Sequence, residues 1–260
     1  MKALVRYGWD VNRRDLDGET ALFRAEDGAT VRALVACGAT INIRDRNDLS
    51  PLACRSTFNS PTEAGAFEAL LDLGARDVSA FVLGALLNNP AGVKMLLDHG
   101  WNVDMPKENG STPLMFALSD FDFWKEDSAL LLIRRGANVN AQNKEGTTPL
   151  HLVAGMGLSP GGTPSAHSKK MVLVVLNALL ARGAHVNTPD HQGETPLMIA
   201  AENLRPDLVR ILLQHGARVN LRTKERETAL SMTRQNPYLK TDPANQSRVI
   251  RILRAAGARE

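Results

Sequence analysis

The chain has 260 residues, of which 43% are hydrophobic and 5% aromatic, and its formal net charge is +3. This apolar content is too high for a disordered chain, and the scarcity of aromatic residues favours thin helical layers over one large globular centre. The first residues lack the apolar core of a signal peptide, and no run approaches the roughly 18 apolar residues of a membrane span. We therefore expect a cytoplasmic protein without a membrane-spanning segment.

A glycine ends an apolar, helix-compatible run eight times along the chain. At six of these positions the sequence continues as Gly-x-x, then Val or Ile, then Asn or Asp. A glycine at this point supplies the left-handed residue that closes a helix, and the residues after it lead into a turn. The eight positions are Gly8, Gly38, Gly74, Gly100, Gly136, Gly183, Gly216 and Gly257.

A second phrase, Gly-x-Thr-Pro-Leu or a close variant, follows most of these glycines. It lies within residues 15–22, 107–114, 143–150 and 190–197. Its glycine permits a positive φ in a tight turn, Thr is a good N-cap, and Pro is tolerated at the first helical position. In two further copies the glycine is replaced, by Asp48 before Ser50 and by Arg226 before Thr228. The phrase predicts a turn followed by a helix start.

Each turn is followed by a short helix, a break and a second apolar helix. We expect the second helices over residues 31–37, 67–73, 93–99, 128–135, 172–182, 208–215 and 248–256. Gly and Pro residues in segment 157–168 cannot continue a helix, so that segment is expected to loop out as an insertion. The last unit is also extended, through Asn236 and Pro237 to Asp242 and Pro243.

These phrases resemble the ankyrin repeat. Residues 190–220 are the best single match, and Thr148-Pro149-Leu150-His151 carries the family's tetrapeptide intact. The resemblance implies an all-α ankyrin solenoid of about seven turn-helix-loop-helix units plus a leading half-unit, forming one domain over residues 1–260. The half-unit is expected at 1–14, and the units at approximately 15–44, 45–75, 76–106, 107–141, 142–187, 188–220 and 221–260.

The resemblance also implies the function. Ankyrin-repeat proteins usually contact a partner protein through a concave face of turn tips and first helices, so we expect a scaffold, adaptor or inhibitor. The aromatic and acidic segment 119–127 adds interface-type residues. The candidate partner-binding residues are Asp17, Glu19, Glu26, Arg46, Asp48, Lys107, Asn109, Asp120, Phe121, Phe123, Trp124, Lys144, Glu145, His191, Gln192, Glu202, Asn203, Lys224 and Arg226.

Motifs for catalysis, cofactors and metals are missing from the sequence. There is no P-loop, no Gly-x-Ser-x-Gly elbow and no zinc spacing among the six histidines or the two cysteines, Cys37 and Cys54. His151 belongs to the tetrapeptide, and the resemblance implies structural hydrogen bonds for it. We expect a monomer that is not an enzyme and binds no cofactor or metal. If the chain is a bacterial effector, we expect it to be secreted into a host cell and not to remain in the cytoplasm where it is made.

Two alternatives follow from charge and from the start of the chain. Residues 205–260 carry 12 Lys/Arg and 5 Asp/Glu, or 12 − 5 = +7, whereas residues 1–204 carry 19 and 23, or 19 − 23 = −4. The basic end leaves open the binding of nucleic acid or an anionic surface. We do not expect nucleic acid, because the aromatic residues that stack single-stranded bases are scarce there. The chain could also be a regulatory fragment of a larger protein.

Overall fold

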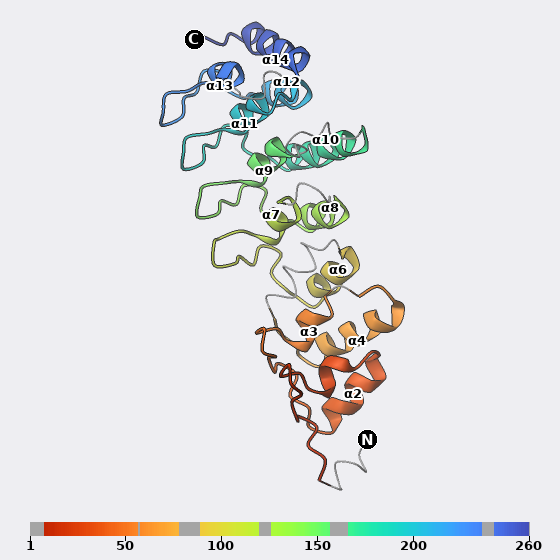
Figure 1. Ribbon diagram of the computed structural model, residues 1–260. Coiled ribbons are helices and arrows are strands. Elements are labelled where there is room, and N and C mark those ends of the chain that lie inside the picture. The colour runs from red at the N-terminus through yellow and green to blue at the C-terminus, as the bar shows by residue number, and fades with distance from the viewer. Residues whose placement is uncertain are drawn as a thin grey trace. The chain divides into compact units, whose positions relative to one another are not determined.

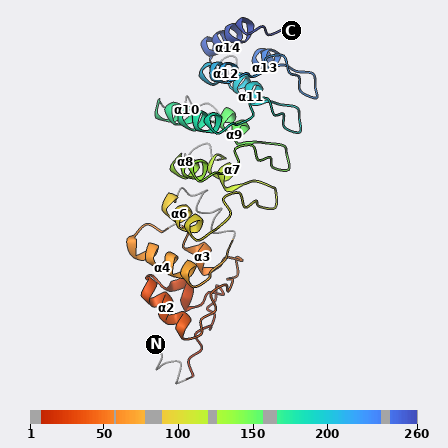
Figure 2. The same cartoon turned by 180° about the vertical axis from the view of Figure 1, so that it is seen from behind.

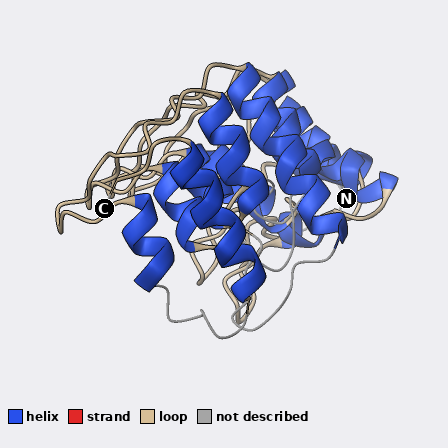
Figure 3. Cartoon of the chain, turned by 90° about the horizontal axis from the view of Figure 1, so that it is seen from above, coloured by secondary structure: helices blue, strands red, loops and turns tan. Residues whose placement is uncertain are grey.

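The computed structural model describes residues 8–56, 58–77, 89–119, 126–156, 166–235 and 242–259. Within these ranges the only regular elements are helices, joined by loops and turns (Figure 3). This confirms the prediction of an all-α repeat. The chain divides into two compact units, unit 1 over Met1–Met105 and unit 2 over Pro106–Glu260.

Unit 1 contains a short 3-10 helix and four α-helices in its described part. They are η1 (Ala21–Arg24), α2 (Gly28–Ala36), α3 (Pro51–Cys54), α4 (Pro61–Asp72) and α6 (Pro90–Asp98). Helix α2 packs along α4, and α4 in turn contacts α3 and α6. The core between them consists of fully buried apolar side chains such as Leu22, Val31, Phe67, Leu70 and Leu96.

In its described residues, unit 2 is a stack of four helix pairs. Its helices are α7 (Pro113–Ala117), α8 (Glu126–Arg134), α9 (Pro149–Gly155), α10 (Ala166–Ala181), α11 (Pro196–Glu202), α12 (Pro206–Gln214), α13 (Ala229–Gln235) and α14 (Pro243–Ala255). In Figures 1 and 2 the first helices α7, α9, α11 and α13 lie next to the projecting loops. The second helices α8, α10, α12 and α14 lie on the side away from the loops. Helix α11 packs against α9 and α13. Each repeat therefore buries apolar surface against its neighbours.

The first helices begin where the Thr-Pro phrase predicted. Thr112, Thr148 and Thr195 are extended N-cap residues, and each side-chain oxygen accepts a hydrogen bond from the backbone N–H three residues later. A proline occupies the first helical turn in all three, where no intrahelical N–H bond is lost. Ser50 caps α3 in the same way. The predicted turn-then-helix reading is confirmed at these positions.

The second helices begin earlier than the sequence analysis expected. Helix α4 starts at Pro61 after the N-cap Ser60, and α6 starts at Pro90 after the N-cap Asn89. Helix α14 starts at Pro243, capped by Asp242, in the segment that was read as a loop extension. The expected starts rested only on apolar residues that recur at helical spacing. The first turns of these helices are polar and lack such residues, but an N-cap Ser, Asn or Asp followed by proline favours a helix start there.

The turn positions are left-handed, as predicted. Gly18, Gly110 and Gly146 have φ between 78° and 80°, and Gly193 has φ 86°. Asp48 and Arg226, which replace the glycine in two copies, have φ of 60° and 68°. Because a side chain in this region costs about 1–2 kcal/mol, the repeat imposes the turn on these two residues against their local preference.

Candidate interaction surface

The projecting loops are five-residue turns with a common set of backbone hydrogen bonds, and we call them the tip loops. In the loop 190–194, the backbone N–H of Asp190 donates to the carbonyl of Glu194 at 2.9 Å. The Asp190 carboxylate then accepts from the N–H groups of Gln192 at 2.8 Å and Glu194 at 2.9 Å. A short polar side chain at the first position thus rigidifies the turn. The described tip loops are 15–19, 45–49, 107–111, 143–147, 190–194 and 223–227.

Neighbouring tip loops within a unit are joined by backbone hydrogen bonds. The second residue of one loop donates its N–H to the carbonyl of the third residue of the preceding loop, and this holds the exposed tips in register. In unit 1 the bond runs from Arg46 to Asp17 at 3.0 Å. In unit 2 the three bonds, each 2.9 Å, are Lys144 to Asn109, His191 to Glu145 and Lys224 to Gln192.

Asparagines of the Gly-x-x-Val-Asn phrase form a second row of bonds between repeats. In unit 2 the Asn187 side chain donates to the carbonyl of Gly216 at 3.0 Å and accepts from the N–H of Arg218 at 2.7 Å. Asn140 and Asn220 make the same two bonds to their next repeats. The phrase that marked the repeat in the sequence is therefore also a joint between repeats.

The structure places most candidate residues on the tips and leaves some outside the described residues. Three candidates are half-buried: Glu19, Glu202 and Asn203. Asp120, Phe121, Phe123 and Trp124 lie outside the described residues. The exposed candidates are Asp17, Glu26, Arg46, Asp48, Lys107, Asn109, Lys144, Glu145, His191, Gln192, Lys224 and Arg226.

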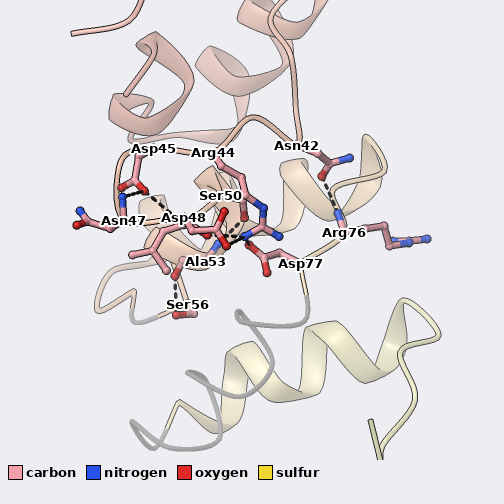
Figure 4. Close-up of polar contacts among 11 residues, drawn as sticks. Asn42, Arg44, Asp45, Asn47, Asp48, Ser50, Ala53, Ser56, Arg76 and Asp77 are labelled. Carbon is pink, nitrogen blue, oxygen red and sulfur yellow. Dashed lines mark hydrogen bonds and ion pairs between the residues drawn. The ribbon is translucent and has the colours of Figure 1, made fainter. Parts of the chain in front are cut away.

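Some charged candidates in unit 1 already have partners within the chain. The Arg44 guanidinium lies against the carboxylate and carbonyl of Asp48 and 3.5 Å from the buried carboxylate of Asp77 (Figure 4). Arg24 forms an ion pair with Glu19 at 2.7 Å. The charges of Asp48 and Glu19 are thus partly neutralised, whereas no ion pair within the described ranges engages Arg46.

Several carboxylates lie close enough to interact around α11 and the neighbouring tip loops of unit 2. Burial and the neighbouring carboxylates, Asp190 and Glu202 foremost, raise the pKa of Glu194. Burial and Glu227 raise the pKa of Glu202. Half-buried acids that repel one another would gain from a cationic neighbour.

His151 has the structural role that the resemblance implied. Its Nδ1 accepts from the N–H of Thr148 at 3.1 Å, and its Nε2 lies 3.0 Å from the carbonyl of Glu194 in the next repeat. These bonds require a neutral ring with its proton on Nε2. Burial lowers the pKa of His151, which favours the same neutral form.

The basic residues near the C-terminus lie on several different elements. Lys224 and Arg226 belong to a tip loop, whereas Arg248 and Arg251 lie on the exposed side of α14, opposite the buried Val249. Arg218, Arg254 and Arg259 are exposed at the C-terminal ends of second helices and in the turns that follow. The basic residues that cluster in the sequence are thus distributed over a tip loop, helix α14 and the turns that follow second helices.

The described residues contain neither a metal-binding cluster nor a helix suited to cross a membrane. Among the described residues, no three His, Cys, Asp or Glu side chains lie close enough together to hold a metal ion. Across those same ranges, no helix combines the length and apolar character needed to cross a bilayer.

Comparison with known proteins gives consistent matches. A model of ankyrin repeats in three copies matches residues 122–223. Human inversin is 29% identical over 171 residues, covering 60% of this chain but only 16% of inversin. Stress-activated protein kinase alpha of Dictyostelium discoideum is 43% identical over 129 residues, or 18% of that protein. The chain thus spans a small part of these long relatives.

In contrast, the ankyrin repeat protein YahD of Escherichia coli (strain K12) is 32% identical over 171 residues, which cover 83% of its length. With the repeated tip loops and helix pairs, this match shows that the chain belongs to the ankyrin-repeat family.

Proposed function

We propose that this chain binds a partner protein through the tip loops and first helices of its repeats, and that it performs no catalysis of its own. The observation that carries the proposal is the combination of a fixed backbone with varied side chains. Backbone bonds hold successive tips in register. The second tip position nevertheless carries Glu108, Lys144, His191 and Lys224 in unit 2.

This pattern suits recognition more than internal packing. Core positions repeat as Leu, Val and Ala from one repeat to the next, because each must fill the same space. The side chains at the second and third positions of the tip loops are exposed and differ in charge and size, so packing does not select them. Pre-ordering of the loops also reduces the conformational entropy that a partner must remove on binding.

The proposal is tested by capture from a lysate of the source organism with quantitative mass spectrometry. The immobilised wild type is compared with a Lys144→Ala/Lys224→Ala variant on the tips. The control is Lys169→Ala/Lys170→Ala, which removes two exposed cations from α10 in the same unit. We expect a protein that is retained by wild type and control and depleted at least severalfold with the tip variant. Equal retention by all three would contradict binding through these tips.

A further inference from the structure

The ends of the second helices in unit 2 form a surface that the proposed tip-loop interface does not use. The segments 133–138, 180–185, 213–218 and 254–259 occupy equivalent places in the four repeats, each spanning the last helical residues and the Gly-Ala that follows. Together they contain six arginines, two histidines and no acid. We call this surface the basic edge: Arg134, Arg135, Arg182, His185, His215, Arg218, Arg254 and Arg259.

All eight side chains of the basic edge are exposed. Among the described residues, no ion pair engages Arg134, Arg182 or Arg218. The equivalent segments of unit 1 differ, because they contain Asp72 and Asp98, which lie 3.7 Å from Arg32 and 2.6 Å from Lys94. Positive charge at the C-terminal end of the second helix is therefore not a general requirement of the repeat.

Helix stabilisation explains only part of the basic edge. A cation at a helix C-terminus interacts favourably with the macrodipole, and this accounts for Arg135 and Arg182 at the ends of α8 and α10. Arg218 and Arg259 lie beyond the last helical residues, where this effect has faded. Their backbone N–H groups are instead held by the Asn187 and Asn220 side chains, at 2.7 and 2.8 Å.

This anchoring gives the edge a regular spacing. His185, Arg218 and Arg259 occupy the same position in three successive repeats, each held by an asparagine of the previous repeat. Packed helices are about 8–10 Å apart, so these side chains recur at roughly that interval. A peptide in the extended polyproline II conformation advances about 3.1 Å per residue with three residues per turn, so every third side chain lies on the same face at roughly 9 Å and matches the interval.

We propose that the basic edge binds an acidic, extended segment of a protein, with carboxylate or phosphate groups facing successive arginines. Guanidinium groups make two-pronged hydrogen bonds with such anions. The four segments contain no Phe, Tyr or Trp, which disfavours the base stacking typical of single-stranded nucleic acid. The large exposed hydrophobic residues of the described ranges, Trp9, Leu16 and Val174, all lie outside the edge, so it lacks a membrane anchor.

The test uses a fluorescein-labelled peptide of about twelve residues with Glu at every third position, which places the Glu side chains on one face at the repeat interval in the polyproline II conformation. Its binding to the full chain is followed by fluorescence anisotropy at about 0.05 and 0.15 M salt. The test variant is Arg218→Gln/Arg259→Gln. The matched control, Lys169→Gln/Lys170→Gln, removes two exposed cations about 18 Å along α10 from the edge. Circular dichroism checks that both variants keep their helix content.

We expect the peptide affinity to fall about tenfold in the test variant and less than about twofold in the control, since each exposed ion pair contributes modestly. A further variant, Arg218→Lys/Arg259→Lys, should retain part of the affinity because it keeps the charge but loses the planar fork. Equal losses in test and control variants would overturn the proposal in favour of non-specific charge attraction. Tighter binding of an RNA oligonucleotide or of anionic phosphatidylserine vesicles, with the same sensitivity to Arg218 and Arg259, would also overturn it. The peptide assay does not involve the tip loops, so its failure leaves the proposed tip interface untouched.

Discussion

The close contact between tip loops makes a sharp prediction about Gly193. This residue has φ 86°, and a Cβ built on it would lie 3.0 Å from both the N atom of Lys224 and the Cα atom of Thr223. Gly216 has the same φ of 86° but open space around the Cβ position. Gly193→Ala and Gly216→Ala therefore impose the same backbone strain, and only the first imposes a steric clash.

The expected losses in the free energy of unfolding follow from the backbone strain and the steric clash. A left-handed Ala costs about 1–2 kcal/mol, partly offset by the reduced freedom of the unfolded chain, so we expect Gly216→Ala to lose about 1 kcal/mol. In Gly193→Ala the clash falls on backbone atoms and pushes apart the loops joined by the Lys224–Gln192 bond. Overpacking of this kind adds about 1–3 kcal/mol, for a total of roughly 2–4 kcal/mol.

Urea unfolding of the two variants, followed by circular dichroism at 222 nm, measures both free energies of unfolding. A loss for Gly193→Ala that exceeds the loss for Gly216→Ala by at least about 1 kcal/mol supports the packed ladder of tip loops. Equal losses would refute it, because they would leave only the dihedral strain that both positions share.

Three further substitutions should change stability in defined directions. Arg226→Gly should stabilise the chain by about 0.5–1 kcal/mol in urea unfolding, because it removes a left-handed side chain that is exposed. Asn187→Ala should lower the free energy of unfolding by about 1–3 kcal/mol, because it deletes the bonds to Gly216 and Arg218. Glu194→Gln should raise the Tm at pH 7 and have little effect near pH 4. The raised pKa of this acid means that its charged form destabilises the fold above that pKa, and that protonation relieves the cost as pH falls through it.

Each substitution has a matched control. Lys224→Gly, in the same tip loop at a residue without positive φ, should destabilise, so a gain equal to that of Arg226→Gly would contradict the strain argument. Asn203→Ala replaces an asparagine for which no side-chain bond to another repeat is seen in the described ranges, and a loss as large as that of Asn187→Ala would contradict the joint. For Glu194→Gln, a Tm gain that persists unchanged at pH 4 would show that charge is not its cause.

Local backbone requirements made much of the fold predictable. A left-handed turn residue favours glycine, and a helix start favours a capping oxygen that Thr supplies, so the turn at Gly193 and the cap at Thr195 could be placed from sequence. The same reasoning placed the exposed tip residues, because the repeat leaves its most variable positions at the turn. Hydrophobic periodicity does not detect a helix start made of polar residues, such as the start of α14 at Pro243, and therefore predicts a loop there.

Contacts between repeats were decided only in three dimensions. Leu204 has a φ of 50° yet is buried, and the next residue, Arg205, is buried with its guanidinium donating to the carbonyl of Met156 at 2.7 Å and facing Asp207. A sequence pattern would leave such an arginine in solvent. The chain alone determined where each repeat turns and where its first helices start, because those choices depend on neighbouring residues. Which charges meet, and which arginines gather along the basic edge, depend on residues about thirty to fifty positions apart, and only the stacking of repeats brings those together.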